Sequence, residues 1–107
     1  MQPPGSRKVT QLCEQAREAL SMALTCSADP ALRELSVASV SPAPDASRLL
    51  VTIETDVDSA QTADHDYILD KLQVARGYLR SEVAGAIHRK RTPELMFRVF
   101  VGPTRTV

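Results

Sequence analysis

Residues 72–97 read LQVARGYLRSEVAGAIHRKRTPELMF, and this stretch decides the fold of the chain. Apolar residues recur in it, and just before it, at the three- and four-residue spacing of a helix: Ile68, Leu72, Ala75, Leu79, Val83 and Ile87. The stripe continues through Gly77, although glycine in a helix interior costs about 1 kcal/mol relative to alanine. We predict two helical halves nearly in line, joined at Ala75-Arg76-Gly77 by a kink or a close backbone approach. A merely tolerated glycine is the simpler alternative.

A cluster of cationic or titratable residues follows this helix: His88, Arg89, Lys90 and Arg91. Cations near a helix C-terminus complement the negative end of its dipole, so Arg89 and Lys90 are either dipole partners or ligands of an anion such as RNA. Helical spacing also places several residues on one face, and this face is either solvated or in contact with phosphate. Its members are Arg76, Arg80, Ala84, His88 and Arg91.

Outward from this stretch, the pattern predicts strands on both sides. Thr92-Pro93 breaks the helix, and apolar residues then alternate with others from Leu95 to Val101, which predicts a strand that stops at Gly102-Pro103. Upstream, two strand-like segments, 35–40 and 48–55, flank the turn-forming sequence SPAPDAS. An antiparallel hairpin is the economical interpretation, with one face of residues 48–55 in the core and the other mostly in water.

The remaining segments predict one further helix and a loop. Apolar residues at helical spacing indicate an amphipathic helix over Arg7–Ser27, with Ser6 as its N-cap and Asp29-Pro30 as its end. Residues 56–64 form a polar loop, in which Thr62 or Asp64 can cap the next helix.

The element order α-β-β-α(kink)α-β predicts the fold class. The long helical connection to the last strand allows a right-handed crossover between parallel strands, whereas the hairpin is antiparallel. We therefore expect an α+β two-layer sandwich, with a three-stranded mixed sheet and helices on one face. With 107 residues, the chain is expected to be one domain over 1–107, with a flexible entry at 1–6 and a short tail at 103–107.

Charge is unevenly distributed, although the formal net charge is zero. Residues 34–70 contain eight acidic residues and one basic residue, whereas residues 71–107 contain eight basic residues and two acidic ones. Such an asymmetry predicts an electrically polar molecule whose positive side is a candidate phosphate surface. Arg7 and Lys8 lie at a helix start, where the dipole disfavours cations, so they are either solvated or bound to phosphate.

Several classes of function are disfavoured by what the sequence contains. Cys13 and Cys26 are about 20 Å apart along one predicted helix, so they cannot pair and are expected to be ordinary thiols of a reducing compartment. His65 and His88 form no metal-binding or catalytic spacing with them. Three acids could hold magnesium, but they are better interpreted as helix N-terminal charge: Asp64, Asp66 and Asp70. We expect no catalysis, metal, cofactor, small-molecule substrate or membrane association, and a cytoplasmic monomer.

The chain resembles the bacterial ribosome-binding factor A family, whose fold is a variant of the type II KH domain. The resemblance extends from about Arg7 to Phe100, and it rests on ADPAL (28–32), VTIETDVD (51–58), LQVARGYLR (72–80) and RTPELMF (91–97). In that family an Ala-x-Gly interhelical kink replaces the Gly-x-x-Gly loop of ordinary KH domains, and Ala75-Arg76-Gly77 is similar to that kink.

The resemblance implies a non-catalytic assembly factor that binds the immature 30S subunit and its 16S rRNA, assists late maturation and 16S 5′-end processing, and serves in cold adaptation. With the resemblance we expect RNA contact at Ala75, Arg76, Gly77, Arg80, His88 and Arg91, and the further candidates for phosphate contact are Arg89, Lys90, Arg7 and Lys8. The alternative is a non-catalytic protein-interaction module with the same fold, whose acidic hairpin docks a basic protein.

Overall fold

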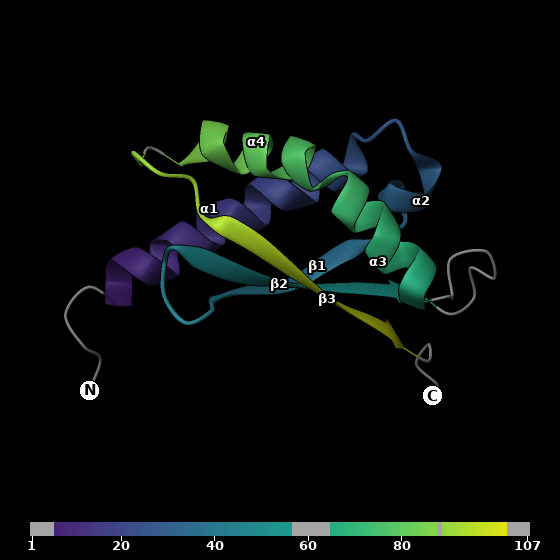
Figure 1. Ribbon diagram of the computed structural model, residues 1–107, viewed down its shortest axis with the longest axis horizontal. Helices are drawn as coiled ribbons and strands as arrows, with labels where there is room; N and C mark the ends of the chain where they lie inside the picture. The colour runs from purple at the N-terminus through teal and green to yellow at the C-terminus, as the bar shows by residue number, and fades with distance from the viewer. Residues whose placement is uncertain (1–5, 57–64, 88, 103–107) are drawn as a thin grey trace.

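The computed structural model describes residues 6–56, 65–87 and 89–102 of the chain. Within these residues, three strands form one sheet and the helices cover one face of it, which gives two layers (Figure 1). The predicted α+β architecture is confirmed. In chain order, the elements are α1 (Ser6–Thr25), α2 (Pro30–Arg33), β1 (Ser36–Pro42), β2 (Arg48–Asp56), α3 (His65–Val74), α4 (Arg76–Ala86) and β3 (Glu94–Gly102).

The strand β2 lies at the centre of the sheet, between β1 and β3. Residues 36–42 of β1 pair with residues 49–54 of β2 in the antiparallel sense. Residues 48–56 of β2 pair with residues 94–102 of β3 in the parallel sense. Parallel pairing requires a long crossover, which α3 and α4 provide, so the predicted mixed sheet is confirmed.

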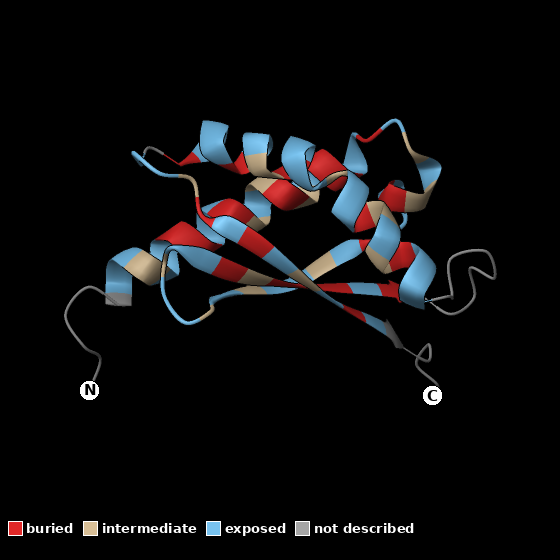
Figure 2. Cartoon of the chain, viewed as in Figure 1, coloured by how far each residue is buried: buried red, intermediate tan, exposed pale blue. Residues whose placement is uncertain are grey.

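The core lies between the sheet and the helices, where the buried residues of both layers meet (Figure 2). In β2, Leu49, Val51 and Ile53 are at most 1% exposed, whereas Glu54 is exposed, as the alternation predicted. The apolar stripe of the two-helix segment is buried too, apart from the half-buried Ala75. Its buried members are Ile68, Leu72, Leu79, Val83 and Ile87.

The opposite face of the sheet carries no helix, which confirms the predicted open face (Figure 1). Met96 and Phe100 are 43% and 50% exposed there. Arg98 lies over the Phe100 ring, 5.4 Å from its centroid, and donates a hydrogen bond of 3.2 Å to the Thr52 hydroxyl. Thr52 is therefore buried on a face that is otherwise mostly in water.

The first helix begins at Ser6, the residue predicted to cap it, and ends at Thr25, two residues earlier than predicted. Asp29-Pro30 does not end this helix but starts α2, so that prediction was wrong. The Asp29 carboxylate accepts a hydrogen bond of 3.0 Å from the Ala31 N–H and so acts as the N-cap. Pro30 is tolerated at the first helical position because the N–H it lacks would have no partner there.

Asp29 also connects α2 to α3. Lys71 Nζ donates a hydrogen bond of 2.9 Å to Asp29 Oδ2, and it lies 5.6 Å from the centroid of the Tyr67 ring. The hydrogen bond from Lys71 lowers the pKa of the Asp29 carboxyl, and the bond from the Ala31 N–H lowers it further. The ionised carboxylate is thus favoured by the folded state.

We expect replacement of Asp29 by asparagine (D29N) to make the free energy of unfolding less dependent on pH under acidic conditions. Because the folded-state pKa of Asp29 is lowered, its charge contributes stability above the unfolded pKa of about 4, and this contribution disappears as pH falls through the folded pKa. Asparagine keeps the helix cap but cannot ionise. Urea midpoints should therefore fall more steeply below about pH 4 in the wild type than in D29N. Parallel curves for the two proteins would contradict this.

The helical segment breaks at Ala75, between α3 and α4. Ala75 has φ −85° and ψ 0°, outside the regular helix, yet its N–H still donates to the Lys71 carbonyl at 3.1 Å. The two helices then run in clearly different directions, so the expectation of helices nearly in line was wrong (Figure 1). Ala75 is half-buried and packs against the core, whereas Gly77 belongs to the first turn of α4.

Candidate nucleic-acid interface

The α3–α4 break presents a small residue and a cation to solvent. Arg76 and Gly77 are both exposed. No backbone strain requires glycine at this position, and a Cβ added to Gly77 would meet no described atom within 4 Å. None of the described parts of the chain therefore makes a close approach to Gly77, which leaves room there for a partner.

The break also begins a helix that lacks a cap. Ala75 occupies the N-cap position of α4 and makes no side-chain hydrogen bond there. The first N–H groups of a helix have no partner inside it, and they lie at the positive end of its dipole. Together with the Arg76 guanidinium, this end of α4 can receive a phosphate oxygen.

Arg80 connects α4 to the start of β3. Its Nε donates to the Pro93 carbonyl oxygen at 3.1 Å, and its Nη2 donates to the Thr92 carbonyl oxygen at 2.8 Å. Glu94 Oε2 lies 3.4 Å from the same Nη2. The side chain remains 40% exposed and a guanidinium has five N–H donors, so Arg80 can hold this loop and still reach a phosphate.

The basic residues that follow α4 lie in a loop rather than on its face. The helix ends at Ala86, and Ile87 is extended, with φ −112° and ψ 147°, which keeps its side chain in the core while the chain turns towards β3. The prediction that Arg91 continues the helical face of Arg80 and Ala84 was therefore wrong. His88 lies outside the described residues.

The fold brings the start of the chain to this loop. Lys8 of α1 and Arg89 line one groove of about 550 Å³, although they are far apart in the sequence. We call these two residues, together with the cations next to them in the sequence, the cationic end: Arg7, Lys8, Arg89, Lys90 and Arg91. All five are exposed, and none is within ion-pair distance of a carboxylate belonging to a described residue.

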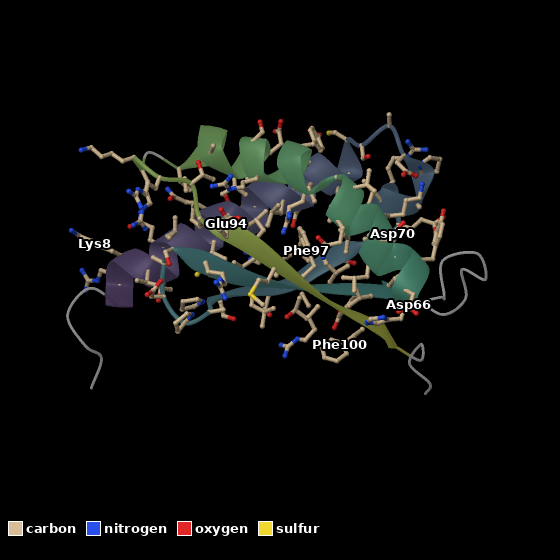
Figure 3. The ribbon with its side chains drawn as sticks, viewed as in Figure 1. Lys8, Asp66, Asp70, Glu94, Phe97 and Phe100 are labelled. Atoms are coloured by element: carbon tan, nitrogen blue, oxygen red, sulfur yellow. The ribbon has the colours of Figure 1, made fainter. Side chains whose placement is uncertain are left out.

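Some of the positive and negative charge lies at opposite ends of the molecule's long axis, although Arg33 of α2 and Lys71 of α3 belong to the end that carries the acids. Lys8 lies at one end, whereas Asp66 and Asp70 project from α3 towards the other (Figure 3). A separation of charge along an axis of 44 Å orients the molecule in the field of a polyanion, with the cationic end leading. The α3–α4 break lies between the two ends of the molecule. It is about 16 Å from the cationic end, which is the length of a helix with the 11 residues of α4.

Thiols and metal ligands form no centre in the described part of the chain. Cys13 is buried in α1, whereas Cys26 lies just after this helix and is exposed, so the expectation that both cysteines lie on one helix was wrong for Cys26. Burial, followed by the neighbouring Glu14, raises the pKa of the Cys13 thiol, which keeps it protonated and weakly nucleophilic. Nowhere among the described residues do three His, Cys, Asp or Glu side chains gather to hold a metal ion.

Two features of this interface were not predicted from the sequence. One is the groove itself, because its walls come from α1, the β1–β2 turn and the residues after α4. The other is the attachment of Arg80 to the loop at residues 92–94. The described helices include none that is long and apolar enough to span a membrane.

A model of the family described as ribosome-binding factor A matches residues 8–99. The chain belongs to the ribosome-binding factor A family. The match covers α1 through most of β3, and it therefore includes both the α3–α4 break and the cationic end apart from Arg7. A search of curated proteins finds no match.

Solved structures of the same family share this architecture. The crystal structure of ribosome-binding factor A from Thermus thermophilus is 26% identical, with a TM-score of 0.72 over 85% of this chain and 93% of that one. A homology model of the Thermus thermophilus factor, fitted into a cryo-EM map of a 30S complex, is 26% identical, with a TM-score of 0.64 over 81% and 89%. A Thermotoga maritima protein solved by NMR, 15% identical, supports the fold alone, with a TM-score of 0.62 over 100% and 99%.

Proposed function

We propose that this chain is a non-catalytic assembly factor that binds the immature 30S ribosomal subunit through its 16S rRNA. The observation that carries the proposal is the cationic end, where α1 and the α4–β3 loop bring Lys8 and Arg89 to one groove with no described carboxylate to neutralise them. Unpaired cations gathered in this way suit a phosphate backbone. The Thermus thermophilus relative fitted into a 30S map supports the same partner.

The proposed mechanism is preferential binding to a precursor conformation of the subunit. A ligand shifts a conformational equilibrium only by its differential affinity for the two states, so a factor without catalytic groups can still promote maturation. Assistance to 16S 5′-end processing would then be indirect, since the factor would hold the rRNA in the form on which nucleases act. Cytoplasmic location, a monomeric state and service during cold adaptation belong to the same proposal.

Sedimentation through a sucrose gradient tests this function. We expect the tagged chain to comigrate with free 30S particles and to be absent from 70S ribosomes. Cells that lack the chain should accumulate 16S rRNA with an unprocessed 5′ end. Migration at the top of the gradient, with normal 16S ends, would exclude the proposal and favour a non-catalytic protein-interaction module whose acidic hairpin docks a basic protein.

Alanine at Gly77 (G77A) should weaken 30S association about tenfold while leaving the fold intact. A Cβ at Gly77 meets open space in the chain, and alanine is the better helix former, so the free energy of unfolding should not decrease. A close RNA backbone at the α3–α4 break would, however, be displaced by the added methyl group, and a loss of about 1.4 kcal/mol corresponds to tenfold.

Gly85 provides the matched control for this experiment. It lies in the same helix, and a Cβ there also meets no described atom within 4 Å. The G85A variant should bind 30S subunits like the wild type in a co-sedimentation assay. Equal affinities for G77A, G85A and the wild type would show that no partner approaches Gly77 closely.

A further inference from the structure

The groove at the cationic end contains more than charge. Lys8, Gln11 and Gln15 line it from one face of α1, since their spacing of three and four residues places them in a row. Its apolar lining combines the buried Leu12 and Ile87 with the half-buried Val9 and Ala46, and the latter two offer apolar surface that a ligand can reach. Arg89 lines it from the loop after α4. A surface that served only to attract phosphate would need neither the amides nor the apolar lining.

This combination suits a nucleotide. A glutamine amide offers a donor and an acceptor side by side, which can pair with the edge of an unstacked base. Aliphatic side chains accept the flat face of a base, and an arginine plane can stack on it or hold its phosphate. The volume of about 550 Å³ is in the range of small-ligand sites.

Charge favours a nucleotide over a cationic or neutral ligand. Two of the described residues that line the groove are cationic, and none of them is acidic. In the β1–β2 turn, the acidic residue Asp45 directly precedes Ala46, which lines the groove. Its carboxylate is held by the Ser47 N–H at 2.9 Å and by the Ser47 hydroxyl at 2.6 Å, so it is already bonded within the turn.

We propose that this groove binds one unpaired nucleotide of the RNA partner. Its base lies against the half-buried Val9 and Ala46, and Gln11 and Gln15 bond to its edge. Lys8 and Arg89 contact the phosphates on either side. The inference rests on the proposed function, because the ribosomal RNA supplies the nucleotide, but it adds a base-reading site to what is otherwise a phosphate surface.

A comparison of hexaribonucleotides with and without bases tests this site. Fluorescein-labelled oligo(A), oligo(C) and oligo(U) are titrated with the full chain by anisotropy, beside an abasic hexamer of the same charge. We expect at least one of the three to bind about tenfold more tightly than the abasic hexamer, because contacts to the base add to the affinity that the phosphates supply. The Q11A/Q15A variant should lose this preference, whereas Q73A, which alters an exposed glutamine of α3, should keep it.

Any of the following results would contradict the proposed nucleotide site. Equal binding of the abasic hexamer would leave only a phosphate surface, and tighter binding of hexaglutamate than of every RNA would indicate an acidic peptide as the ligand. No measurable binding of any oligonucleotide would also exclude it. Co-sedimentation of Q11A/Q15A with 30S subunits separates this result from the function: association without base preference removes the nucleotide site and retains the assembly factor.

Discussion

We expect simultaneous replacement of Lys8 and Arg89 by glutamate (K8E/R89E) to lower affinity for immature 30S subunits by at least about 100-fold. Hydrogen bonds to charged groups contribute about 1.5–3 kcal/mol each, and two such contacts are lost and replaced by repulsion. The fold should tolerate the change because both side chains are exposed, and glutamate in the first turn of α1 is favoured by the helix dipole. Quantitative co-sedimentation with purified immature subunits measures the effect.

A second charge-reversal variant controls for net charge. R17E/R98E changes the formal charge equally, but Arg17 pairs with Glu14 on α1 and Arg98 lies on the open face of the sheet. This variant should retain most of the affinity. If it weakened association as strongly as K8E/R89E, the effect would come from net charge, and the cationic end would not be a specific surface.

Salt dependence adds an independent measurement to the same variants. Each phosphate contact contributes roughly 0.7 to 0.9 to the slope of log affinity against log salt concentration. The slope for K8E/R89E should therefore be smaller than that of the wild type by about 1.5. An unchanged slope would mean that Lys8 and Arg89 do not contact phosphate, even if affinity decreased.

The elements of this fold were predictable because their patterns are periodic. Alternation in β2 and the helical stripe from Ile68 to Ile87 both follow from burial of one face, so sequence alone placed them correctly. Asp29-Pro30 was misinterpreted because the same pair can stop one helix or start another; here Asp29 caps α2 through the Ala31 N–H and also contacts Lys71 of α3. That contact joins residues 42 positions apart, which no local pattern reveals.

The candidate site was less predictable than the fold, for the same physical reason. Basic residues near positions 8 and 89 could be recognised individually, but their convergence on one groove depends on how α1 packs against α4 and the sheet. Likewise, the bend between α3 and α4 occurs at Ala75, although Gly77 was the residue with the recognisable helix-breaking tendency. The break therefore occurs at the residue that packs against the core, Ala75, and not at the glycine.

The packing of α3 supports this bend, and we expect L72A to lower the free energy of unfolding by about 2–5 kcal/mol. Leu72 is 0% exposed, so alanine leaves a cavity where the helices meet the sheet. Two residues later, Val74 is 81% exposed, and V74A should change stability by less than about 0.5 kcal/mol. Urea denaturation of both variants measures the difference. Similar losses in the two would mean that Leu72 does not face the core, and the orientation of α3, and with it the geometry of the α3–α4 break, would have to be different.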